Sequence, residues 1–137
     1  MQPPADFEAW PFPSPVLDRL GPFYRHRTDH LRVGFRVVDH QLNARGFLHA
    51  GVLATFADVV IGHGLGGLAR PPRRGVTVNL VCDYLGSAAT GAWVDGVVTP
   101  AHVGGRMSSG RIEFTVDGKA VAAARGMYMT VDAPPGS

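Results

Sequence analysis

The chain has 137 residues, 45% of them hydrophobic, and a net charge of +2 from 13 basic and 11 acidic side chains. This composition predicts one globular domain with its own core and excludes a disordered chain. The small, mixed charge argues against nucleic acid or an anionic membrane as the main partner. The single cysteine, Cys82, excludes an internal disulfide and a cysteine-based zinc cage.

Residues 1–21 are expected to form an irregular N-terminal arm, because five prolines fall within the first 15 positions. Within this arm, Pro15 to Leu20 fits one short helix with Ser14 as its N-cap. The segment has no basic start and no apolar run, so it does not read as a signal peptide. We therefore expect a cytoplasmic protein.

A half-buried strand is expected next, since apolar and polar residues alternate from Leu31 to Val38, with a shorter strand at Phe23-Tyr24-Arg25. An apolar run then predicts a helix from about His49 to about Leu65, ended by glycines. Asp58 is the only charged residue between Ala50 and Ala69. Together with the glycines, it favours a buried helix over a transmembrane span.

Four strands with no helix between them are expected after the proline-containing loop at 70–75. They are predicted at Val76–Tyr84, Ala92–Val103, Arg106–Val116 and Lys119–Val131. This order predicts an α+β fold in which an antiparallel sheet wraps around one long central helix. The domain is expected to cover residues 22–131, followed by a C-terminal tail at 132–137. One sheet covers only one side of so apolar a helix, so the other side needs an oligomer partner or a second sheet.

Two stretches of the chain resemble the PaaI-like hotdog-fold acyl-CoA thioesterases. The first runs from Asn43 through Gly46 to His49-Ala50-Gly51, with Asp58 nine positions after His49; the second is Gly75-Val-Thr-Val-Asn-Leu followed by Asp83-Tyr84-Leu85. The resemblance covers roughly residues 25 to 131. It implies a hotdog fold and hydrolysis of an acyl- or aryl-CoA thioester, with no cofactor beyond the coenzyme A of the substrate. Ala50 departs from the family's His-Gly-Gly triplet but keeps the backbone N–H.

Asp58 is the most informative candidate, because a carboxylate in apolar surroundings is costly unless it is paired or used. It could serve as general base or nucleophile, or it could be a structural residue bonded to an amide or an arginine. Donors for the developing oxyanion are expected at the helix start, in the N–H groups of Ala50 and Gly51. The alternative is that Gly51 is a packing glycine and His49 only a cap.

The spacing of Ala50 and Asp58 decides how such a site is built. They are eight residues apart, which is about 12 Å along a helix. One carbonyl carbon cannot lie within about 3 Å of both groups. If both act on one thioester they come from different subunits, so we expect a homodimer with two composite sites.

The resemblance assigns roles within this composite site. Asn43 and the Ala50 N–H of one subunit hold the carbonyl oxygen, and His49 supports the site near the leaving thiol. Asp58 and Thr77 of the partner subunit handle the water or the covalent step. From the residues alone, Asn43 could equally be a turn former and Thr77 a β-favouring residue on a polar face shared with Asn79. A homotetramer is the expected assembly.

Binding of the substrate is expected to involve Gly46 and Gly51 and a set of arginines. Coenzyme A carries phosphates, so cationic side chains are expected at the pocket mouth. The candidates are Arg70, Arg73, Arg74 and Arg106, each of which could instead be an ordinary surface arginine. No metal site is expected, because His26 and His30 lie in strand-like surroundings with no third ligand on the same face.

Two other functions stay open on the sequence. A hotdog hydratase or dehydratase would need a histidine paired with an acid, which His49 and Asp58 of the partner subunit could supply. A non-catalytic acyl-binding module would need neither group. The nature of the acyl chain is not predicted.

Overall fold

The computed structural model describes residues 2–131, so the tail expected at 132–137 lies outside the described residues. The strands are β1 (Phe7–Ala9), β2 (Tyr24–His26), β3 (Arg32–Arg36), β4 (Arg74–Tyr84), β5 (Trp93–Val103), β6 (Met107–Val116) and β7 (Lys119–Val131). The helices are α1 (Pro15–Leu20), the short 3-10 helix η1 (Asp39–Gln41) and α2 (Ala50–Leu68).

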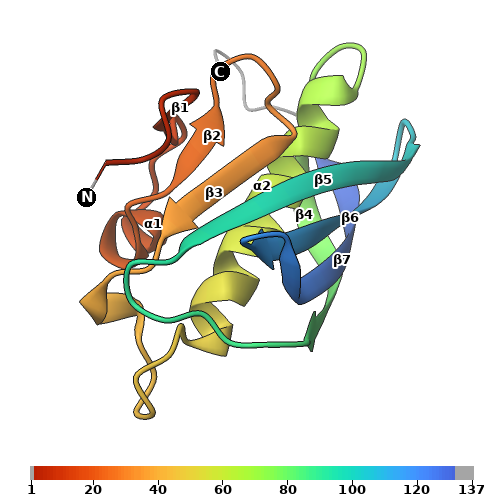
Figure 1. Ribbon diagram of the computed structural model, residues 1–137. Helices are drawn as coiled ribbons and strands as arrows, with labels where there is room; N and C mark the ends of the chain where they lie inside the picture. The colour runs from red at the N-terminus through yellow and green to blue at the C-terminus, as the bar shows by residue number, and fades with distance from the viewer. Residues whose placement is uncertain (1, 132–137) are drawn as a thin grey trace.

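These strands form one antiparallel sheet in the order β1-β2-β3-β5-β6-β7-β4. Figure 1 shows the sheet curving around α2, with β3 and β5 in front of the helix and β4 behind it. The prediction of an antiparallel sheet around one central helix is confirmed. Each strand after the helix begins and ends within two residues of its expected bounds.

The core lies between α2 and the inner face of the sheet. Seven side chains of α2 are buried, and one of them, Phe56, is fully buried and contacts several aromatic rings. Its ring stacks on Phe23 at 4.3 Å and meets Phe35 edge-on at 5.3 Å. By length and composition alone α2 would pass as a membrane span, but in this fold its apolar side chains pack on the sheet.

The N-terminal arm is more ordered than expected. Ser14 caps α1 by accepting a hydrogen bond from the Leu17 N–H, as predicted. The expectation of an irregular arm is wrong at β1, which pairs with β2 and extends the sheet. Phe7 anchors this strand, because its ring is buried and meets Trp93 edge-on at 5.0 Å. The proposed domain boundaries stay a prediction.

β4 is an edge strand whose register shifts between Thr77 and Asn79. Thr77 lies opposite Tyr128, whereas Asn79 lies opposite Met127. Neighbours along a strand point to opposite faces, and cross-strand partners share a face. Thr77 and Asn79 therefore lie on opposite faces, and the prediction that they share one polar face is wrong, because the extra residue of a bulge re-aims the side chains beyond it.

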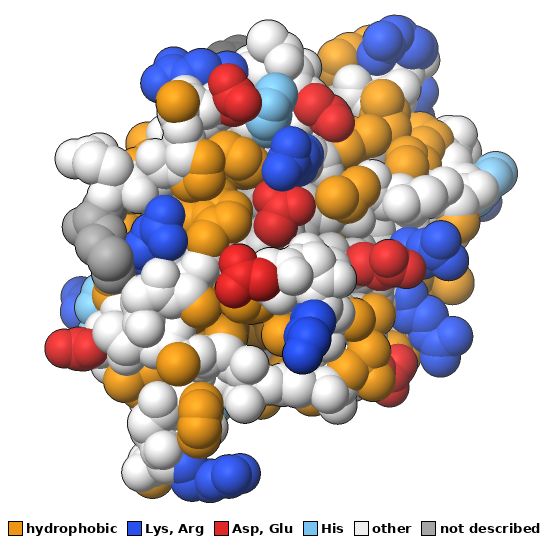
Figure 2. Space-filling model, in the orientation of Figure 1, with side chains coloured by type: hydrophobic (Ala, Val, Ile, Leu, Met, Phe, Trp, Pro, Cys, Tyr) orange, Lys and Arg blue, Asp and Glu red, His pale blue; other side chains and the backbone are white. Residues whose placement is uncertain are grey.

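The outer face of the sheet carries both charged and apolar side chains. Figure 2 shows acidic and basic groups scattered among hydrophobic ones on the face that β3 and β5 present. The same outer face continues over β7, where the outward-facing Met127 and Met129 are both 43% exposed. On the edge strand β4, Val76 is 46% and Val78 is 53% exposed.

Candidate active site

Two of the hollows that border α2 contain the predicted catalytic residues, one at the start of the helix and one along its middle. The first has a volume of about 350 Å³ and is lined by Asn43, His49, Ala50 and Tyr84, among others. The second has a volume of about 670 Å³ and contains Asp58, Thr77 and Tyr128. No residue lines both hollows. The site residues predicted from the sequence thus fall into two groups.

The loop before α2 fixes the side-chain amide of Asn43. Its Oδ1 accepts hydrogen bonds from the N–H groups of Arg45 (2.9 Å) and Phe47 (3.2 Å). Gly46 completes the turn at a φ of 87°, a conformation that favours glycine. Asn43 is therefore a turn former, and with Oδ1 occupied its Nδ2 hydrogens are left without a partner among residues 2–131.

The start of α2 leaves one backbone donor open. His49 caps the helix, since its Nδ1 accepts the Gly51 N–H at 2.8 Å. The His49 N–H in turn donates to the Gln41 carbonyl at 2.8 Å. No hydrogen-bond acceptor for the Ala50 N–H lies within the described part of the chain. Of the two N–H groups expected to hold an oxyanion, only that of Ala50 is free in this conformation.

A tyrosine fastens this helix start to the sheet. The Tyr84 hydroxyl, from the end of β4, donates to the Ala50 carbonyl at 2.7 Å. Burial is the main cause that raises the pKa of Tyr84 to about 12, so the phenol stays a donor at neutral pH.

Asp58 lies in the second hollow and is held by two hydroxyl groups. Its Oδ1 accepts hydrogen bonds from Thr77 Oγ1 at 2.7 Å and from the Tyr128 hydroxyl at 3.3 Å. The single Tyr128 hydroxyl proton is shared between Oδ1 and the backbone carbonyl oxygen of Asp58, which lies closer, at 2.9 Å. No arginine and no backbone N–H bonds to the Asp58 carboxylate among the residues described.

Tyr128 is the site residue that sequence reasoning missed. It lies on β7, 70 residues after Asp58, and only 4% of its surface is exposed. Burial and the neighbouring Asp58 charge raise the pKa of Tyr128 far above its usual range. The alternating pattern of the last strand marks it as an inward aromatic, but only the pairing of Thr77 with Tyr128 reveals its neighbour.

The four arginines differ in what they contact. Arg70 donates to the carbonyls of Gly67 and Ala69 at the end of α2, and Arg73 donates to the Gly105 carbonyl at 2.8 Å. Arg73 and Arg74 both line the hollow that holds Asp58. Arg106 lies in the turn between β5 and β6, outside both hollows. Arg74 is the member of the set that combines a place in the hollow with a guanidinium free of hydrogen bonds within 2–131.

No cluster of three or more metal-binding side chains occurs among the described residues. One hollow offers the carboxylate of Asp58 with its two hydroxyl partners. The other offers the Ala50 N–H near the side-chain amide of Asn43.

Comparison with known proteins agrees with this architecture. Residues 45–123 match the family model described as "Thioesterase superfamily". The chain is 33% identical over 117 residues to "Putative esterase PA0474" of Pseudomonas aeruginosa, covering 84% of this chain and 87% of that protein.

Solved structures share the fold. The Escherichia coli PaaI protein from the phenylacetic acid degradation operon superposes with a TM-score of 0.68 at 21% identity, covering 74% of this chain and 72% of that one. A thioesterase from Streptococcus pneumoniae, described as hypothetical and solved with coenzyme A, has a TM-score of 0.68 at 24% identity, covering 73% and 79%.

A curved antiparallel sheet around one long helix gives this protein the hotdog fold, which it shares with the Escherichia coli PaaI protein. The chain belongs to the thioesterase superfamily, whose chemistry is that of hydrolases.

Proposed function

We propose that this protein is an acyl-CoA thioesterase that hydrolyses the thioester of an acyl- or aryl-CoA in the cytoplasm. The observation that carries the proposal is the carboxylate of Asp58, held by Thr77 in an open hollow of a thioesterase-superfamily fold. Coenzyme A bound to the structural neighbour from Streptococcus pneumoniae supports the choice of thiol.

The site is proposed to be shared between two copies of the chain. Ala50 and Asp58 lie eight residues apart on one helix and border different hollows, a separation of about 12 Å along the axis. A single thioester carbonyl cannot reach both groups of one chain. It can do so where the start of one α2 meets the middle of the partner's α2.

In this arrangement the thioester oxygen accepts hydrogen bonds from the Ala50 N–H and the Asn43 Nδ2 of one subunit. Asp58 of the partner subunit either takes a proton from the attacking water or attacks the carbonyl carbon itself. Either route gives a tetrahedral oxyanion, which the two donors stabilise. If water is the attacking group, collapse of the oxyanion breaks the C–S bond and gives the carboxylic acid, and the proton taken up by Asp58 passes to the leaving coenzyme A thiolate. If Asp58 attacks, collapse expels the thiolate and leaves an acyl–Asp58 anhydride. Water then hydrolyses this anhydride to the carboxylic acid and the free Asp58 carboxylate, and its proton goes to the thiolate.

The edge of the sheet supports a dimer. β4 is 11 residues long and pairs with β7 on one side only. Its Val76 and Val78 are about half exposed, and a long apolar edge strand is a template for another strand. We propose that β4 meets the β4 strand of a second copy, and that a homotetramer forms when two such dimers associate.

The arrangement at His49 favours hydrolysis over hydration of a double bond. A hydratase needs its histidine for proton transfer at carbon. Here the His49 Nδ1 is engaged with the Gly51 N–H, so the ring serves as a helix cap. A non-catalytic binding module would not need a carboxylate whose second oxygen, Oδ2, accepts no hydrogen bond from residues 2–131.

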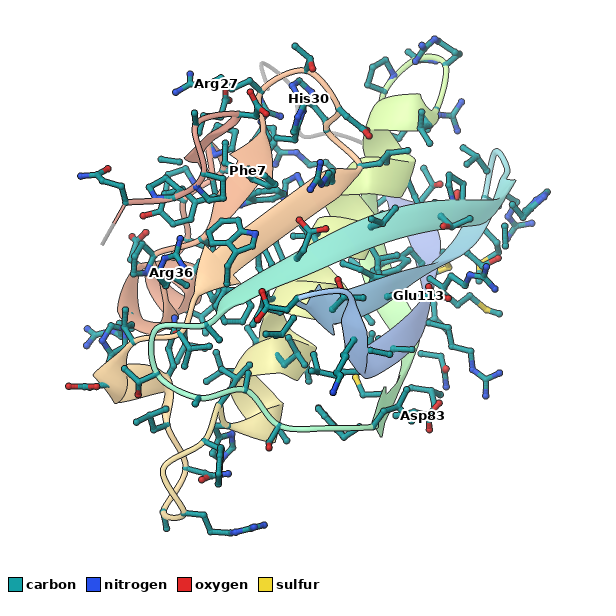
Figure 3. The ribbon with its side chains drawn as sticks, in the orientation of Figure 1. Phe7, Arg27, His30, Arg36, Asp83 and Glu113 are labelled. Atoms are coloured by element: carbon teal, nitrogen blue, oxygen red, sulfur yellow. The ribbon has the colours of Figure 1, made fainter. Side chains whose placement is uncertain are left out.

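The test is release of free thiol from a panel of straight-chain and aromatic acyl-CoAs, measured for the wild type and for Asp58→Asn. We expect the wild type to release thiol, and the variant to be slower by about 10³-fold while still binding the substrate in calorimetry. Glu113→Gln is the matched control, because Glu113 is exposed on β6 and lines neither hollow (Figure 3). A wild type that releases no thiol from any of these esters overturns the proposal.

A further inference from the structure

We propose that Tyr128 is a positioning residue for Asp58, and that it works with Thr77 to hold Oδ1 so that Oδ2 is the oxygen that acts on the thioester. This inference rests on the proposed function, since it names how the acid of that site is aimed. The sequence resemblance assigns nothing to Tyr128.

The two hydroxyl donors converge on one carboxylate oxygen. Thr77 Oγ1 lies 2.7 Å and the Tyr128 hydroxyl 3.3 Å from Oδ1 of Asp58. No hydrogen bond to Oδ2 exists among residues 2–131. Two donors on one oxygen fix the plane of the carboxylate and leave the lone pairs of the other oxygen available. Oδ2 is therefore the atom left to accept a proton from water or to attack the carbonyl carbon.

Tyr128 is itself held tightly. Its one hydroxyl proton makes a three-centre hydrogen bond, with the Asp58 carbonyl at 2.9 Å and Oδ1 at 3.3 Å, which ties the ring to both the backbone of α2 and the carboxylate. A Cβ at Gly126 would lie 2.6 Å from the Tyr128 hydroxyl oxygen, and one at Gly62 would lie 3.1 Å from its ring. Both positions therefore need a small residue for the ring to reach Asp58. Gly62 on α2 and Gly126 on β7 thus leave the space that the Tyr128 ring occupies.

The hydroxyl is also in the protonation state that the role requires. Burial and the adjacent Asp58 charge keep the pKa of Tyr128 far above neutral. The group therefore donates a hydrogen bond throughout the working pH range and does not serve as a base. The Tyr128 hydroxyl therefore affects the orientation of the Asp58 carboxylate and does not exchange protons with the substrate.

The variant that tests this role is Tyr128→Phe, which keeps the ring and removes the hydroxyl. We expect kcat for acyl-CoA hydrolysis to fall about 10-fold with KM changed by less than about twofold, because a misaimed acid slows the chemistry and not the binding. Tyr24→Phe is the matched control, since Tyr24 lies on β2 beside Trp93, outside both hollows. It should leave both constants unchanged.

A second measurement does not depend on turnover. Urea midpoints are compared for the wild type, Tyr128→Phe, Asp58→Ala and the double variant. If the hydroxyl bonds to the carboxylate, the Tyr128→Phe shift is smaller in the Asp58→Ala background than in the wild type.

The outcomes separate the two proposals. A wild type without thioesterase activity overturns the proposed function, and the midpoints then decide the Tyr128–Asp58 contact by themselves. An active wild type whose kcat is unaffected by Tyr128→Phe overturns the positioning role, as do additive midpoint shifts.

Discussion

The start and the middle of α2 offer opposite kinds of chemistry. At the start, the group of interest is a backbone N–H that the cap at His49 leaves free at Ala50. In the middle, it is the side chain of Asp58, positioned by hydroxyl groups from two strands. A backbone donor survives a change of side chain, whereas a carboxylate does not. This difference explains how the chain can carry Ala50 where its resembled family has glycine.

The largest effect is expected when the acid is removed from one subunit and the helix-start N–H from the other. Asp58→Asn removes the acid, and Ala50→Pro removes the N–H. Proline is well tolerated at the first position of a helix, and the extended backbone of His49 suits a residue that precedes proline. Unfolded, mixed and refolded in equal amounts, the two variants should recover about a quarter of wild-type activity, because half of the dimers are mixed and each mixed dimer has one intact site.

This recovery amounts to a rise of about 250-fold over Asp58→Asn alone if that variant is 10³-fold impaired. The measurement is thiol release by the remixed sample, with each variant refolded alone as the control. A mixture no more active than its components would show that both groups act within one subunit.

The backbone half can be tested by itself with two substitutions at the same residue. Ala50→Pro should lower kcat about 10²-fold, the usual cost of losing one oxyanion donor. Ala50→Gly keeps the N–H and should stay within about threefold of the wild type, because only a methyl group is lost. Steady-state kinetics on one acyl-CoA decides the matter. Equal losses in both variants would mean that the methyl group, and not the N–H, matters at Ala50.

A smaller effect is expected at the mouth of the acid's hollow. Arg74 lines that hollow, and its guanidinium makes no hydrogen bond to residues 2–131, so we expect it to bind the phosphates of coenzyme A. Arg74→Gln should raise KM about fivefold and leave kcat unchanged. Arg111→Gln, on an exposed position of β6, is the control. The assignment is wrong if both variants have the KM of the wild type, or if raising the salt concentration does not weaken wild-type binding.

The smallest effect concerns the pH dependence of stability. Burial, and then the Arg74 charge, lower the pKa of His63 below its ordinary value of 6.5. The unfolded chain therefore binds a proton more readily than the folded one, so stability is lost as the pH falls below about 6.5. His63→Phe keeps a ring to stack on Phe12, which lies 4.5 Å from the imidazole. Its urea midpoint should drop less than that of the wild type between pH 7.5 and 5.5, and equal drops would contradict the assignment.

Local patterns in the sequence were enough to predict most elements. The helix α1, its Ser14 cap and the four strands after α2 all follow from short-range signals. α2 runs three residues further than expected, to Leu68. The glycines near its end lie within the helix, and at Gly66 a Cβ would lie 2.3 Å from the Arg73 carbonyl oxygen. Close packing, and not helix termination, requires glycine there.

The features that escaped prediction depend on contacts between distant parts of the chain. β1 has only three residues. It forms a strand because it pairs with the edge of β2 and because the side chain of Phe7 is buried. The convergence of Thr77 and Tyr128 on Asp58 depends on the pairing of β4 with β7. Asp58 and Ala50 could be named from the sequence, and their spacing along the helix predicted that they act apart, but the side chains that line the two hollows follow from the fold.

The bulge in β4 has a consequence for comparing this chain with its relatives. An alignment that slides by a single position near Val78 changes its score very little, yet it exchanges the residue that meets Asp58 for one on the opposite side of the sheet. A functional label carried across such an alignment would then fall on Val76 or Val78, neither of which has a hydroxyl. Alignments through this strand should be anchored on Thr77 and its partner Tyr128 before any role is transferred.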